Sequence, residues 1–92
     1  MTNREQELYD YLIDWFGYDE SAAEEVIEDK SYLCWSSLKD FGLAIFNEDI
    51  EPNVDADIAE LIYSCIDLER LADMYIDGDV RFATEHYVFE LL

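Results

Sequence analysis

Carboxylates dominate the charge of this chain, which carries 24 Asp and Glu residues against 5 Lys and Arg and has a formal net charge of -19. An acidic composition leads to disorder when apolar residues are scarce. Here 51% of the residues are hydrophobic and 15% are aromatic, so the chain has enough apolar side chains for a core. A folded domain with this charge repels itself. We therefore expect the acidity to serve the binding of a strongly basic partner.

The length fits a single acidic domain, residues 1–92, at the small end of the usual range. A domain of this size has a radius of gyration of about 12 Å and a long dimension of about 30–40 Å. A 30 Å piece of B-DNA carries about 18 phosphate charges, at one per ~1.7 Å of axis. The charge of the domain is of the same order, so imitation of DNA is quantitatively feasible.

The same charge argues against two classes of partner. Five scattered basic residues cannot form the patch that binds nucleic acid or an anionic membrane. No apolar run approaches the ~18 residues of a membrane span, and the first residues lead directly into a charged helix. We expect a protein without a signal peptide, in the cytoplasm of a bacterial host. The basic residues are Arg4, Lys30, Lys39, Arg70 and Arg81.

Apolar residues at helical spacing predict helices over residues 3–16, 21–29, 38–46 and 55–66, followed by a kink or restart and a helix over 67–76. Ser21, Ser37 and Asp67 are the expected N-caps. Gly17 and Asn47 are expected to end two of the helices, and residues 48–53 to form a loop. The side chains expected to face inward are Leu8, Leu12, Trp15, Phe16, Ala23, Val26, Ile27, Leu38, Phe41, Ile45, Phe46, Ile58, Leu61, Ile62, Cys65, Leu68, Leu71, Ala72 and Tyr75.

Three segments have the composition of strands. Residues 31–36 are aromatic-rich, and residues 80–83 and 87–91 flank a three-residue turn, as in a hairpin. A turn is expected at residues 77–79. The order of elements predicts an α+β fold, a mostly helical small domain with a three-stranded antiparallel sheet that includes the C-terminal hairpin.

Residues suited to catalysis or metal binding are few. His86 is the sole histidine and lies in a predicted turn, without a positioned nucleophile. Cys34 and Cys65 are interpreted as small buried hydrophobes. The EF-hand-like stretch that begins at Asn53 lacks the required glycine and bidentate Glu. We expect no enzyme activity, no cofactor and no metal site, although an acidic enzyme stays open as a third alternative.

Carboxylates line the outer faces of the predicted helices. Side chains at i, i+3 and i+4 stand about 5–6 Å apart, similar to phosphates along a strand. Ordinary outer faces interleave Lys with Glu, because like charges at i+4 destabilise a helix. We therefore favour an acidic surface with a binding function. Adaptation to high salt is a competing explanation of the acidic surface. The predicted phosphate mimics are Glu7, Asp10, Asp14, Asp57, Glu60, Glu69 and Asp73, with a second cluster at Asp19, Glu20, Glu24, Glu25, Glu28 and Asp29.

Three C-terminal stretches, Cys65–Ala72, Ile76–Phe82 and His86–Leu91, carry a resemblance to a known family. Their order resembles the end of ArdA antirestriction proteins, in which an Ile-Asp-aromatic helix start leads to a Gly-containing turn and a final hairpin; Leu68 stands at the aromatic position here. The similarity covers residues 8–92 and corresponds to the C-terminal half of a full family member. It implies an elongated acidic dimer that imitates bent B-DNA and inhibits host defence on behalf of a phage or mobile element. Dimer contacts are expected on the apolar residues of helix 38–46 or on the hairpin edge.

These observations predict a DNA mimic that blocks the DNA-binding channel of a host defence nuclease, either a type I restriction-modification enzyme or a CRISPR-Cas effector. The partner would be a basic DNA-binding protein or complex of the bacterial host. The alternative is an immunity-type protein that neutralises a basic nuclease or toxin through a local hot spot of aromatic residues. Charge reversal separates the two hypotheses, since a mimic spreads its binding energy over many carboxylates.

Overall fold

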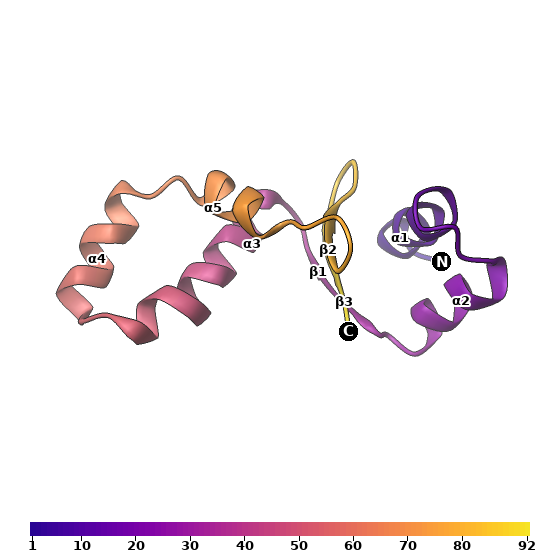
Figure 1. Ribbon diagram of the computed structural model, residues 1–92, viewed down its shortest axis with the longest axis horizontal. Helices are drawn as coiled ribbons and strands as arrows, with labels where there is room; N and C mark the ends of the chain where they lie inside the picture. The colour runs from indigo at the N-terminus through magenta and orange to yellow at the C-terminus, as the bar shows by residue number, and fades with distance from the viewer.

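The computed structural model describes all 92 residues as an elongated body of 49 × 22 × 21 Å with a radius of gyration of 15.2 Å. Figure 1 shows three layers along the long axis, with α1 and α2 at one end, a small sheet in the middle, and α3, α4 and α5 at the other end. The body is longer and thinner than the predicted 30–40 Å, because helices stack outward from both faces of the sheet.

Five α-helices and three strands form a small α+β domain, so the predicted fold class is confirmed. Two short helical turns connect α3 to α4. The elements in chain order are α1 (Asn3–Asp14), α2 (Glu20–Glu28), β1 (Tyr32–Trp35), α3 (Leu38–Ile45), a π-helical turn (Phe46–Ile50), a 3-10 turn (Glu51–Asn53), α4 (Ala56–Cys65), α5 (Leu68–Tyr75), β2 (Arg81–Ala83) and β3 (Val88–Leu91).

The sheet has the strand order β1-β3-β2, and both pairings are antiparallel. The predicted C-terminal hairpin is confirmed as β2 and β3, with Phe82 opposite Phe89. Cys34 of β1 pairs with Phe89 from the other side. Because side chains alternate along a strand, Phe89 and Val88 point to opposite faces. Each face therefore supports its own core.

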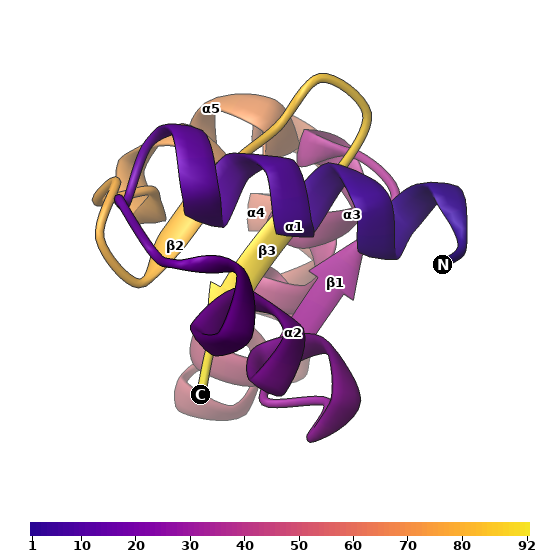
Figure 2. The same cartoon turned by 90° about the vertical axis from the view of Figure 1, so that its right-hand side faces the viewer.

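The N-terminal lobe, residues 1–31, covers one face of the sheet. Figure 2 looks along the long axis and shows α1 and α2 in front of the strands, with α3, α4 and α5 behind them. Leu8 and Leu12 of α1 and Ala23 and Ile27 of α2 pack on Phe82 and Phe89. The Tyr11 ring stacks on Phe82 with centroids 4.6 Å apart. This aromatic core fixes α1 on the hairpin.

The helical lobe, residues 37–76, covers the other face. Phe41 and Ile45 of α3, Ala72 of α5 and Val88 of β3 form its buried cluster. A side chain at Gly42 would overlap the backbone carbonyl of Leu68. Glycine is therefore required where α3 crosses α5.

Two predicted helix boundaries are confirmed and two are wrong. Ser37 caps α3 by accepting the backbone N–H of Asp40 at 3.1 Å, and Asp67 caps α5. The N-cap of α2 is Asp19 rather than Ser21, because its carboxylate accepts the Ala22 N–H at 2.7 Å. Residue 47 does not end α3, since the chain continues through helical turns to residue 53, where a loop was predicted.

Two sets of residues predicted to face inward are exposed. Trp15 is 75% exposed, although its backbone is still helical and its N–H bonds to the Tyr11 carbonyl. On α4, Ile58 and Leu61 are 47% and 65% exposed, and Cys65 is also exposed. The buried residue of α4 is Ala59. The apolar stripe of α4 was thus identified correctly, but its inward orientation was wrong.

Candidate functional site

The exterior of the molecule is the candidate site, and most of its carboxylates are exposed and form no ion pair. Of the 24 Asp and Glu residues, only Glu5, Glu7 and Glu90 are half-buried, and all the others are exposed. Only two ion pairs form in the whole chain, Arg81–Glu90 and His86–Glu7. The acids on the exposed surface therefore have no paired cation.

The acids are divided between the two ends of the body. Ten lie in the N-terminal lobe, ten in the helical lobe, and four in the segment from residue 77 to the C-terminus. The predicted mimics Asp10 and Asp14 are exposed on α1, and Glu69 and Asp73 are exposed on α5. The negative charge consequently extends over the whole 49 Å length.

The second predicted cluster is concentrated on α2 and its caps. All six residues are exposed. Glu20, Glu24 and Glu28 follow one another at i+4 spacing, where like charges repel. None of the five α-helices has a basic residue in its last turn, although a cation there would stabilise the helix dipole. The C-terminal ends of the helices therefore lack this stabilisation, whereas each N-terminal first turn has an acidic residue that favours the dipole.

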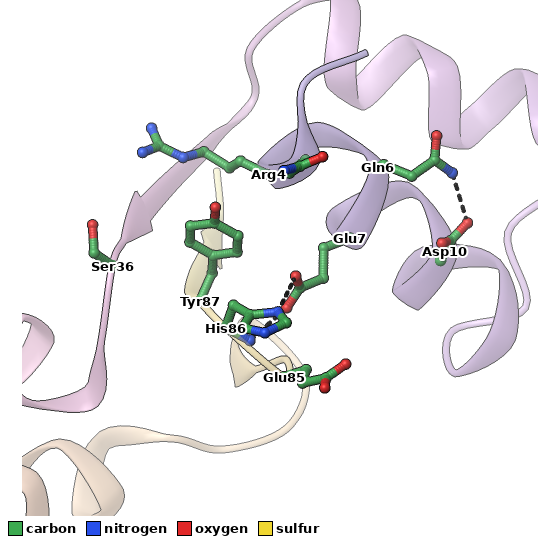
Figure 3. A pocket seen from close by; sticks show the side chains of 9 residues that line it. Arg4, Gln6, Glu7, Asp10, Ser36, Glu85, His86 and Tyr87 are labelled. Carbon is green, nitrogen blue, oxygen red and sulfur yellow. Dashed lines mark hydrogen bonds and ion pairs between the residues drawn. The ribbon is translucent and has the colours of Figure 1, made fainter.

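Glu7 differs from the other predicted mimics, because its carboxylate binds the hairpin turn. Its Oε1 accepts hydrogen bonds from the Thr84 hydroxyl at 2.5 Å and from the His86 backbone N–H at 2.6 Å. Its Oε2 lies 3.0 Å from the His86 Nδ1, and Figure 3 shows the two side chains facing each other. Glu7 was predicted on the outer face of its helix; the structure shows a half-buried carboxylate that ties α1 to the hairpin.

The pKa values of this pair shift in opposite directions. Burial opposes ionisation of Glu7, but the hydrogen bonds from Thr84 and His86 outweigh it and lower the pKa of the carboxyl. The hydrogen bond to Glu7, together with its negative charge, raises the pKa of His86. Both shifts favour a charged pair. Its role is structural, because both partners are engaged with each other.

A hollow in the surface lies beside this pair, between the start of α1 and the hairpin turn. It is open, and only one of its nine lining residues is hydrophobic. Arg4 lies at its edge, with its guanidinium 5.6 Å from the centre of the Tyr87 ring. Small-molecule sites are usually deep and mostly apolar, so this hollow has little of their character. No group of three His, Cys, Asp or Glu side chains is placed to hold a metal ion.

Exposed apolar side chains are the one kind of surface residue that the sequence did not predict. Trp15 stacks on Tyr11 at 5.8 Å and leaves most of its indole in solvent. Cys65 was predicted as buried and is exposed, whereas Cys34 is half-buried as part of the first core. The sequence held no local signal for the exposure of Trp15, because this residue continues the spacing of Leu8 and Leu12 and keeps a helical backbone.

Three apolar side chains of the helix proposed for dimer contact are buried. Phe41, Ile45 and Phe46 are 2%, 6% and 3% exposed within one copy. They pack inside the helical lobe, so these three side chains are not exposed for a contact between copies. The expected dimer contact, on helix 38–46 or on the hairpin edge, stays a prediction.

What the fold and surface define is a small, elongated α+β domain with an unpaired acidic exterior. No protein-family model, no curated protein and no solved structure matches this chain. The similarity to ArdA proteins therefore stays a prediction from the C-terminal residues. None of the helices is both long and apolar enough to span a lipid bilayer.

Proposed function

We propose that this protein is a DNA mimic that occupies the DNA-binding channel of a host defence nuclease. The observation that carries the proposal is the free acidic exterior, which extends along a narrow body. Dividing the 49 Å length by the net charge of 19 gives one charge per about 2.6 Å. B-DNA has one per ~1.7 Å of axis and a single strand one per ~3.4 Å. The charge density of the protein lies between the two.

The mechanism is competition for a basic channel. A groove lined with Lys and Arg attracts the protein over long range, as it attracts DNA. Twelve of the thirteen predicted phosphate mimics are exposed. Of these twelve, only the carboxylates of Asp10 and Asp19 accept a hydrogen bond within the protein. Both type I restriction-modification enzymes and CRISPR-Cas effectors hold DNA in such channels, so both are proposed targets.

Affinity capture tests the proposal. The immobilised protein, exposed to bacterial lysate, should retain basic DNA-handling complexes. Increasing salt should elute them gradually, because each ion pair between the protein and its partner makes binding more dependent on salt. A matched resin carries the triple variant Glu24→Gln, Glu25→Gln, Glu28→Gln and should release the same complexes at lower salt. If the unmodified protein retains no basic protein at low salt, the proposal is wrong.

One observation favours the second candidate, the immunity-type protein. Trp15 is 75% exposed, and exposed tryptophans are common hot spots in protein interfaces. In that case Trp15→Ala should abolish binding to a basic nuclease, while single charge changes should have small effects. A mimic should show the opposite ranking, with similar modest losses from many carboxylates.

A further inference from the structure

Helix α4 is attached to the fold along one side only. It lies at the far end of the helical lobe in Figure 1. Ala59 is 4% exposed, and the Tyr63 ring lies 5.3 Å from Phe46. At 100° per residue, Ile58, Leu61 and Cys65 lie on the side away from Ala59. We call these three exposed residues the α4 stripe.

The spacing of the α4 stripe is that of a helix–helix seam. Its residues stand at i, i+3 and i+7, the arrangement of apolar positions in coiled-coil contacts. A surface helix of a monomeric domain normally turns such a stripe toward the core. Here the core side of α4 is served by other residues, so the α4 stripe is free to contact another helix.

Acidic residues line one side of the α4 stripe. Asp57 and Glu60, the neighbours of Ile58 and Leu61 in sequence, are exposed and form no ion pair. An apolar seam with carboxylates along one border complements a helix that has apolar residues on one face and Lys or Arg beside them. The charge therefore selects a basic amphipathic helix over a neutral one.

A second copy of the chain is a poor occupant on two grounds. Three side chains on a helix about 15 Å long supply only a fraction of the ~800 Å² per partner of a stable interface. Pairing would also bring together two molecules that each carry a net charge of -19. A basic partner gains from the same charge that opposes pairing.

We propose that the α4 stripe docks on a basic amphipathic helix of the partner protein. The carboxylates steer the encounter, and Ile58, Leu61 and Cys65 supply the apolar contact that fixes its position. This inference deepens the proposed function and rests on it, since it names the surface feature of the basic partner that the end of the helical lobe recognises.

The test compares two synthetic peptides of equal positive charge with the full chain as receptor. One is a helical peptide with leucines along one face and lysines along the other, and in the second every leucine is replaced by glutamine. Backbone and methyl NMR shifts, followed at about 0.15 M salt, report affinity and location. The leucine–lysine peptide should bind about tenfold more tightly or better, with its largest shifts at Ile58 and Leu61.

The variant Leu61→Ser should remove most of this tenfold preference and leave binding of the leucine-free peptide unchanged. Met74→Ser is the matched control, because Met74 is also exposed (77%) in the helical lobe but lies outside the α4 stripe. Both residues are largely in solvent, so both variants should fold; circular dichroism verifies this.

Several results would overturn the inference. Equal affinity for the two peptides, or equal effects of the two variants, would remove the α4 stripe as a docking surface and leave the charge-based function intact. Dimerisation in sedimentation that Leu61→Ser abolishes would assign the stripe to a second copy. If the unmodified chain binds neither peptide, the proposed function fails together with the inference.

Discussion

At the scale of single residues, the carboxylates have two different roles. Most are exposed and unpaired, whereas Glu7 is bound by Thr84 and His86 and holds α1 against the hairpin. A sequence pattern cannot separate these roles, because both kinds of residue are acids on the polar side of a helix. The partners of Glu7 lie 77 and 79 residues away in the chain, beyond the range of any local rule.

The substitution Glu7→Gln should destabilise the fold by about 1–3 kcal/mol, since it weakens three hydrogen bonds to a charged acceptor. Urea denaturation measures the free energy of unfolding. Asp14→Asn is the control, because this exposed carboxylate makes no hydrogen bond, and its effect should stay within about 0.5 kcal/mol. Equal effects of the two variants would show that the contact of Glu7 does not stabilise the fold.

The Glu7–His86 pair also predicts a pH dependence. The pKa of His86 is raised above 6.5. The contribution of the charged imidazole to the stability of the fold is therefore complete below pH 6.5 and is lost as the pH rises through the pKa of His86 in the folded state. The pKa of Glu7 is lowered below 4.5. The contribution of its carboxylate to the stability of the fold is therefore complete above pH 4.5 and is lost as the pH falls through the pKa of Glu7 in the folded state.

The stability difference between the unmodified protein and His86→Asn should therefore be larger at about pH 5.5 than at about pH 8. Paired denaturation curves at the two pH values measure it. Using the difference removes the change in overall charge repulsion, which affects both proteins alike. A difference that is constant or grows with pH would contradict the assigned pair.

At the scale of elements, α2 is the clearest case of stability given up for charge. Glu24 has carboxylates four residues away on both sides, at Glu20 and Glu28. Glu24→Gln should stabilise the protein by a few tenths of a kcal/mol, because it removes two repulsive pairs. The same substitution should weaken binding to the proposed basic partner. A variant that gains stability without losing affinity would indicate that α2 does not contact the partner.

The crossing of α3 and α5 makes a second prediction at this scale. Gly42→Ala should destabilise the fold by about 1–3 kcal/mol or more, because the added methyl group meets the Leu68 backbone. Thermal unfolding measures the loss. Lys39→Ala on the exposed side of α3 serves as control and should change stability little. A stable Gly42→Ala protein would mean that the two helices cross less closely.

Local sequence signals predicted most of the helices and strands. The features that they did not predict depend on packing between residues far apart in the chain. The hairpin and the caps Ser37 and Asp67 follow from turn and capping residues within a few positions. Periodicity also found the apolar stripe of α4, but it could not show that the core was already filled by Ala59 and its neighbours. The exposure of Leu61 is therefore a property of the assembled fold, as is the close contact that requires Gly42.

For the whole molecule, the central feature is the length of its acidic surface. Stacking one lobe on each face of a small sheet gives a 49 Å body about 22 Å across. A rounder domain of the same mass would have fewer carboxylates along any one line. The layered arrangement thus converts an ordinary number of residues into a long charged surface, which is the property that a DNA channel recognises.

Competition with DNA is the most direct test of this account. Labelled duplex bound to a purified type I restriction-modification enzyme, or to a purified CRISPR-Cas effector, is titrated with the protein at several salt concentrations. We predict displacement of DNA from at least one of the two, with an affinity that falls steeply as salt increases. DNA that stays bound to both at saturating protein and low salt, or an affinity indifferent to salt, would contradict it.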